Sequence, residues 1–224
     1  MVLTRKKIAM VMAEFLGTAT LTTIVLAVAH SNVGIPYFIS LAVGLTLAAL
    51  VLTFGAVSGA HLNPAVTIGL WSLRRVKAVP AAVYVAAQLL GGWSAYWLYT
   101  YFANRRWDNS GDFEGRILVA EAAGAMVFAM GWAAVMYQKY KGLKAAFAVG
   151  ASLTLGLLVA SIAGVAAGIV SGGIVNPAVA LGTHSWVWGT YVLGPVLGAI
   201  IGFNLYALLF ASTESLKDDL KIKK

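Results

Sequence analysis

The amino-acid sequence predicts an all-α membrane protein with six transmembrane helices and two re-entrant half-helices in an inverted tandem repeat. Composition is the first observation behind this prediction, because 60% of the 224 residues are hydrophobic and only 11% are charged, whereas soluble domains have roughly 25% charged residues. The other two are a series of long apolar segments and a polar motif that occurs once in each half. We expect a single membrane domain over residues 1–224.

Six segments are long and apolar enough to cross a hydrocarbon core of about 30 Å, which takes about 20 helical residues. They lie at about 8–29, 35–57, 79–102, 115–137, 145–168 and 188–211. The first also resembles a cleavable signal peptide, since basic residues precede it. At about 22 residues it is longer than the apolar core of such peptides, and it contains Glu14. We therefore expect it to remain as a spanning helix.

The positions of the basic residues predict the orientation of the chain. With six spans, all of the 16 Lys and Arg residues except Arg105, Arg106 and Arg116 lie on one side of the membrane. The positive-inside rule makes that side cytoplasmic. We expect a protein of the cell membrane with both termini in the cytoplasm, and we interpret the net charge of +8 as a topology signal rather than a nucleic-acid interface.

The sequence offers little for catalysis or metal binding. It has no cysteine, which excludes disulfides, iron–sulfur clusters and a cysteine nucleophile. The three histidines, His30, His61 and His184, lack the spacing of a metal-binding motif. No extramembrane segment is long enough for a catalytic domain, so we expect no enzyme activity, no cofactor and no metal.

Two similar stretches divide the chain into repeats. SGAHLNPAV begins at Ser58 and SGGIVNPAV begins at Ser171. Upstream, AEFLGT in the first half matches AEAAGA in the second, and downstream YVAAQLLGG matches YVLGPVLGA. The repeats cover about 8–102 and 115–211. Each contains three spans, an odd number, so the second repeat enters the membrane from the opposite face.

The Asn-Pro pairs predict the starts of two half-helices. Asn is among the best N-cap residues, and Pro is favoured at the first helical position. About ten apolar residues follow each pair, enough for roughly half the hydrocarbon core. Non-helical backbone at membrane depth must be buried or line a water-filled cavity. A simple kink is the alternative, but duplication at symmetric places favours half-helices. The predicted starts are Asn63, Pro64, Ala65, Asn176, Pro177 and Ala178.

With these motifs, above all SGAHLNPAVTIGLW, the chain resembles the aquaporin family, the major intrinsic proteins, over nearly its whole length. The resemblance implies a passive channel for water or small neutral solutes, in a homotetramer with one pore per protomer. It also implies that Glu14 and Glu121 brace the approach loops from behind the pore, although two intramembrane carboxylates would also suit a proton-relay pump. His61 matches the cytoplasmic pore-lining histidine of the family.

The two Asn side chains predict the central barrier of such a pore. If each Oδ1 atom caps a half-helix, the amide NH₂ groups of Asn63 and Asn176 face the lumen as donors. A water that accepts from both points its hydrogens away from the centre in both directions, so it cannot relay a proton. Each half-helix N-terminus adds roughly +0.5 elementary charge at the same place, which repels protons and cations.

The outer filter departs from the family pattern. Members usually have an arginine after the second Asn-Pro-Ala, where this chain has Val179, and counting back from the Asn residues puts the other filter positions at Val43, Gly164 and Gly173. Such an apolar ring predicts a wide pore that admits solutes such as glycerol or urea. Two alternatives are an apolar ring that dewets and slows water, and an Arg105 or Arg106 side chain that reaches in and restores the charge.

A function of another class is a membrane scaffold or junction protein that keeps this fold with little or no conduction. The short predicted loops argue against it, because they leave almost no extramembrane surface for partners.

Overall fold

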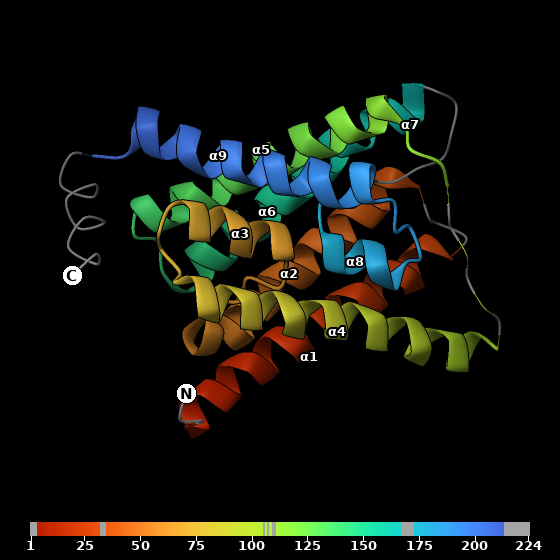
Figure 1. The fold of residues 1–224 in the computed structure, drawn as a ribbon, viewed down its shortest axis with the longest axis horizontal. Coiled ribbons are helices and arrows are strands. Elements are labelled where there is room, and N and C mark those ends of the chain that lie inside the picture. The colour runs from red at the N-terminus through yellow and green to blue at the C-terminus, as the bar shows by residue number, and fades with distance from the viewer. Residues whose placement is uncertain are drawn as a thin grey trace.

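The computed structural model of the chain describes residues 4–31, 35–104, 106, 108, 111–166 and 173–212. These residues form a bundle of helices whose axes run roughly along the length of the molecule (Figure 1). Six helices are long and apolar enough to span a membrane. They are α1 (Arg5–Ala29), α2 (Pro36–Ser58), α4 (Ala78–Ala103), α5 (Gly115–Tyr137), α6 (Gly142–Ala160) and the pair η1 (Trp188–Leu193) and α9 (Gly194–Phe210).

The helix boundaries follow local signals in the sequence. The hydroxyl of Thr4 caps α1 by accepting from the N–H of Lys7, and Pro36 opens α2, where its missing N–H costs nothing. The predicted span at 145–168 is wrong at its C-terminal end, because α6 ends at Ala160 and a short separate helix, α7 (Ile162–Ala166), follows. The sixth span begins with a π-helical turn, η1, before α9 continues it.

Two short helices lie inside the bundle, as the Asn-Pro pairs predict. They are α3 (Pro64–Ser72) and α8 (Pro177–Gly182). Figure 1 shows them in line with one another, between α4 and α9. The second is shorter than the sequence suggests, since α8 has six residues and α3 has nine.

Each half of the chain packs its first helix against its third. Helix α1 packs on α4 and α5 packs on α9, while α2 and α6 meet between the halves. Glycines allow close approach at equivalent places: a Cβ on Gly91 would lie 2.5 Å from the carbonyl oxygen of Phe15, and one on Gly198 would lie 2.0 Å from that of Ala122. Close contact between small residues is typical of helices packed in membranes.

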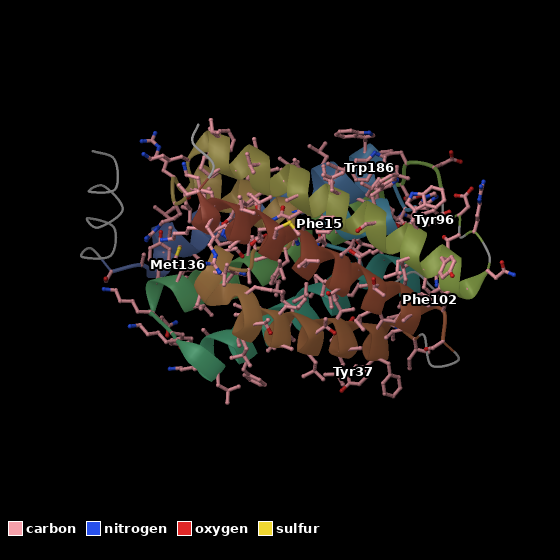
Figure 2. All side chains as sticks on the ribbon, turned by 90° about the horizontal axis from the view of Figure 1, so that it is seen from below. Phe15, Tyr37, Tyr96, Phe102, Met136 and Trp186 are labelled. Carbon is pink, nitrogen blue, oxygen red and sulfur yellow. The ribbon has the colours of Figure 1, made fainter. Side chains whose placement is uncertain are left out.

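The connections that carry basic residues gather at one end of the molecule. Helix α1 begins and α9 ends at the same end, on the left of Figure 1. In Figure 2 the labelled Met136 marks that end, where nitrogen-tipped side chains cluster, and Tyr96, Phe102 and Trp186 lie at the other end. The basic residues of the tail beyond Ser212 lie outside the described residues.

Candidate functional site: two capped half-helices around a narrow path

Asn63 and Asn176 cap the two half-helices through their side-chain oxygens. Asn63 Oδ1 accepts from the N–H of Ala65 at 2.8 Å. Asn176 Oδ1 accepts from the N–H groups of Ala178 at 3.0 Å and Val179 at 3.4 Å. Both Asn residues have extended backbone, and Pro occupies the next position in each helix. Each side chain therefore satisfies backbone donors that the start of a helix leaves without an intrahelical partner.

The two Asn amides also tie the halves of the chain together. Asn63 Nδ2 donates to the carbonyl oxygen of Val175 at 2.9 Å, and Asn176 Nδ2 donates to that of Leu62 at 3.0 Å. The sequence-based expectation of two whole NH₂ groups facing the lumen is therefore wrong in part. One N–H of each amide holds the opposite loop, so one N–H of each remains for a solute.

The residues that immediately precede Asn63 and Asn176 in the sequence have a left-handed backbone conformation. Leu62 has φ of 50° and Val175 has φ of 44°, which is unusual for a β-branched residue. Conformations of this kind cost about 1–3 kcal/mol each and persist only where the surroundings hold them. Here the carbonyl group is held by the opposite Asn, and the N–H donates to a buried carboxylate, Glu14 for Leu62 and Glu121 for Val175.

The two carboxylates brace the approach loops from behind the half-helices. Glu14 accepts four hydrogen bonds, from Ser58 Oγ at 2.6 Å, the N–H groups of His61 at 3.1 Å and Leu62 at 2.7 Å, and Gln88 Nε2 at 2.7 Å. From the described residues Glu121 accepts two, from the N–H groups of Ile174 at 2.8 Å and Val175 at 2.6 Å. Both side chains are buried, and in these hydrogen bonds they act only as acceptors, the role of an ionised carboxylate.

His61 lies on the approach to α3, with one ring nitrogen engaged. Its Nδ1 atom is 3.2 Å from Thr67 Oγ1, which is in turn hydrogen-bonded to Gln88. The sequence analysis missed Thr67 and Gln88. The available signal was a Gln in the apolar run YVAAQLLGG, at the position where the matching run YVLGPVLGA has Pro.

A small apolar cavity lies beside Asn176, where the sequence predicts the outer filter. Its volume of about 20 Å³ is room for about one water molecule. Three predicted filter residues, Val43, Gly173 and Val179, line it together with Asn176. Its other lining residues are Leu21, Val25, Ile39, Leu153, Leu157 and Ile174.

The surroundings of the fourth predicted filter residue, Gly164, lie outside the described part of the structure. Gly164 lies in α7, beyond the end of α6, and α6 contributes Leu153 and Leu157 to the cavity wall. Because these two side chains enter the space, the cavity is narrower than a ring of two valines and two glycines implies. None of the described residues that line it is charged; Arg106 is exposed, and Arg105 lies outside the described residues.

A larger cavity of about 430 Å³ lies near the C-terminal end of α2, toward the end of the molecule marked by Met136. Its wall includes Gly59 and Trp132, and the Trp132 ring meets the His61 ring edge-on with centroids 5.9 Å apart. His61 therefore stands at the inner edge of this cavity. Along α2, the larger cavity is lined from Val51 to Ala56 and the smaller one at Ile39 and Val43.

Comparison with known proteins agrees with this geometry. A family model described as Major intrinsic protein matches residues 2–206. A relative named Aquaporin Z, from Photorhabdus laumondii, is 32% identical over 90% of this chain and 97% of its own length, and Aquaporin AqpM from Methanothermobacter thermautotrophicus is 33% identical over 76% of each. The fold matches the X-ray structure of the aquaglyceroporin from Plasmodium falciparum, with a TM-score of 0.70 at 21% identity, over 96% of this chain and 99% of that one. The chain therefore belongs to the major intrinsic protein family, whose members are membrane channels and not enzymes.

Proposed function

We propose that the protein conducts water and small neutral solutes passively and excludes protons at the two Asn caps. Membership of the family makes it a transmembrane channel for water or small solutes. The finer proposal rests on one observation above all: two half-helices start at capped Asn residues whose amides each donate to the opposite loop. This arrangement fixes donors and helix N-termini at a single level of the path.

The central barrier acts through the remaining N–H of each Asn amide. A water that accepts from both has its lone pairs occupied, and its hydrogens point away from the centre along the path. The N-termini of α3 and α8 add positive partial charge at this level. A hydronium or metal cation is repelled, whereas a neutral solute is not.

The outer filter is, in this proposal, an apolar ring of Val43, Leu157, Gly164, Gly173 and Val179. We include Leu157 beside the predicted Gly164, because Leu157 lines the cavity that contains Val43, Gly173 and Val179. The ring offers a solute no side-chain donor, so it selects by size and by the cost of removing hydration rather than by recognition. The rotamers of Leu153 and Leu157 set its width, which decides between passage of glycerol-sized solutes and slow, partly dewetted passage of water.

The assembly and orientation are also proposals. The basic connections gather at one end of the molecule, which supports a cell-membrane protein with both termini in the cytoplasm. The resemblance supports a homotetramer with one pore per protomer. Bands of exposed apolar side chains on the described spans provide surface for lipid and for neighbouring protomers.

Osmotic swelling of proteoliposomes tests the proposal. Vesicles with and without the protein are challenged with impermeant osmolyte, then with glycerol and with urea, and light scattering follows their volume. We expect water flux, glycerol flux or both to exceed the lipid background and to follow the solute gradient. Flux at background level for the whole panel would favour the non-conducting scaffold instead, and accumulation driven by a proton gradient would indicate a transporter.

A further inference from the structure

A chain of buried polar side chains joins Glu14 to the ring of His61. Gln88 Nε2 lies 2.7 Å from Glu14 Oε2 and 2.9 Å from Thr67 Oγ1, and Thr67 Oγ1 lies 3.2 Å from His61 Nδ1. Glu14, Thr67 and Gln88 are fully buried, and His61 is 6% exposed. Polar groups with no access to water must satisfy one another, so this chain has a definite arrangement of hydrogens.

The second half of the chain lacks every member of this network except the carboxylate. Aligning the repeats on their Asn-Pro pairs puts Ile174 opposite His61 and Ala180 opposite Thr67, and aligning their third helices puts Pro195 opposite Gln88. In the described part of the chain, Glu121 accepts from the backbone N–H groups of Ile174 and Val175. The three side chains thus occur together in one repeat and are absent together from the other, which indicates a unit with a purpose beyond holding the loop.

Packing supports these pairings. A Cβ on Gly69 of α3 would lie 3.3 Å from the carbonyl oxygen of Ala199, and one on Gly182 of α8 would lie 2.5 Å from that of Gly92. Gly69 and Gly182 follow their Asn residues at the same distance in sequence, and Gly92 and Ala199 hold the same place in the two matched runs. The alignment that pairs Gln88 with Pro195 therefore also pairs the residues that make equivalent helix contacts in the two halves.

The donors and acceptors around Thr67 determine where the histidine proton lies. Its hydroxyl has one hydrogen and two lone pairs. Gln88 Nε2 can only donate, so it occupies one lone pair. The carbonyl oxygen of Asn63, 3.1 Å away, and Gln88 Oε1, 3.3 Å away, can only accept, so one of them takes the hydrogen. The remaining lone pair faces His61 Nδ1. A hydrogen bond forms there only if Nδ1 carries the proton.

We propose that Gln88 and Thr67 are positioning residues that fix neutral His61 as the tautomer with its proton on Nδ1, so that Nε2 presents a lone pair to the permeating solute. Glu14, which only accepts in these hydrogen bonds, holds the Gln88 amide so that its NH₂ group donates to both Glu14 and Thr67. This inference rests on the proposed channel function, since it assigns a role to His61 within that path.

Gly59 lies beside His61 Nε2 and has no side chain to cover it. Gly59 has φ of 92°, a conformation that glycine adopts without strain, and a Cβ at this position would lie 3.3 Å from Nε2. Gly59 also lines the larger cavity. A solute leaving the Asn donors for this cavity would therefore meet a fixed acceptor at His61, and water, which has accepted at the Asn pair, has hydrogens to donate here.

Nitrogen-15 NMR of histidine-labelled protein in lipid bilayers tests the tautomer directly. A protonated ring nitrogen and an unprotonated one have well-separated shifts, and a His61→Gln sample assigns the His61 signals by their loss. In the parent at neutral pH we expect Nδ1 protonated and Nε2 unprotonated. A parent in which Nε2 carries the proton would overturn the proposal, whatever the variants do.

Variants then test the relay. Thr67→Val removes the acceptor of Nδ1–H, and we expect the ratio of the two tautomers to shift about five- to tenfold toward the Nε2–H form, the worth of about one hydrogen bond. Thr67→Ser keeps the hydroxyl and should keep the parent tautomer. Thr46→Val is the matched control, because the Thr46 hydroxyl bonds only to its own helix, at the carbonyl oxygen of Ala42.

The outcomes separate this inference from the channel proposal. An unchanged His61 signal in folded Thr67→Val protein would contradict the relay even if the channel conducts. A Nδ1–H parent that conducts nothing in the swelling assay would instead contradict the channel and leave the hydrogen-bond assignment intact. In a conducting parent we also expect Thr67→Val to change the ratio of water flux to glycerol flux, and Thr67→Ser to restore it.

Discussion

The two halves of the molecule are alike at the centre of the membrane and different behind it. Both use a capping Asn, a left-handed residue before it and a buried carboxylate that accepts the N–H of that residue. Only the first half extends this core through Gln88 and Thr67 to a histidine ring. We infer that the shared parts form the barrier, where symmetry serves both directions of passage, and that the unshared parts distinguish the two sides.

The approach loops differ as well. In the first half only four residues, 59–62, separate the end of α2 from Asn63. In the second half, α7 and a longer stretch of sequence lie between α6 and Asn176. Glu14 accepts hydrogen bonds from two loop N–H groups and two side chains. In the second half, Ser161 Oγ also holds the approach loop, because it accepts from the N–H of Gly173 at 2.8 Å. The first loop thus depends on its carboxylate more than the second does.

Removing the carboxylates should give the largest effects. Among the described residues, Glu14→Ala leaves four donors without a partner and Glu121→Ala leaves two, at about 1–3 kcal/mol for each buried unpaired group. We expect both variants to lose thermal stability in detergent micelles, with a drop in Tm for Glu14→Ala about twice that for Glu121→Ala. Equal drops in Tm would show that the two carboxylates contribute equally to stability.

Substitution at the central amides should affect both halves equally. Asn63→Asp and Asn176→Asp each replace an amide N–H by an oxygen, against the carbonyl group of the opposite loop, and add negative charge where donors are needed. We expect proton or cation leak to rise about tenfold or more in each, on the scale of about 1–3 kcal/mol per lost charged-group contact, as followed by a pH-sensitive dye inside the vesicles. Asn204→Asp is the control, because Asn204 is exposed and bonds to Ser72 and its own helix. Leak from only one central variant would contradict the shared barrier.

Features that depend on neighbouring residues could be predicted from the sequence, and contacts between distant segments could not. Asn-Pro pairs act locally, through capping and a fixed φ, so the starts of α3 and α8 could be predicted to the residue. The bond from each Asn amide to the opposite loop could not, because it joins Asn63 to Val175 across the fold and no local pattern encodes it. Gln88 was missed for the same reason, since its partners Glu14 and Thr67 come from two other helices.

The position of the filter illustrates a different limit. Val43, Gly173 and Val179 were placed by short counts from motifs, and they share one cavity with Asn176. Gly164 depended on a count through twelve residues of the fifth span, and the structure ends α6 at Ala160, before that position. The place of Gly164 at the filter therefore stays a prediction, because a count is firm only along a continuous helix or loop.

An arginine in place of Val179 should make the outer part of the path differ more from the inner part in charge and width. Val179→Arg would add a donor and a charge to the cavity that Val179 lines, and an added unit charge costs a nearby cation about 4 kcal/mol at 4 Å with an effective dielectric of about 20. We expect a higher ratio of water flux to glycerol flux and lower ammonium entry in swelling assays. Val179→Leu separates bulk from charge: it should narrow the path without affecting ammonium selectivity. An unchanged ratio in Val179→Arg would mean that Val179 is not at the filter.

Truncation of Leu157 should give the smallest effect on flux and test its place at the filter. Leu157→Ala removes a side chain from the cavity wall, so we expect glycerol flux to rise by about two- to fivefold, together with the loss of about 2–5 kcal/mol of stability that such truncations carry. Leu155→Ala is the matched control, because Leu155 on the same helix is 56% exposed. A sharp loss of flux in Gly164→Leu would place Gly164 at the filter as well.

The central claim is that neutral solutes pass while protons do not, because both Asn caps act at one level of the path. It is tested most directly by recording vesicle volume and internal pH together in the same proteoliposomes, under a solute gradient and then under a proton gradient. The account predicts water or glycerol flux above the lipid background, unaffected by the proton gradient, with proton entry no faster than in empty vesicles; Glu121→Gln should behave likewise. Proton entry that rises in step with solute flux, or solute accumulation driven by the proton gradient, would contradict it.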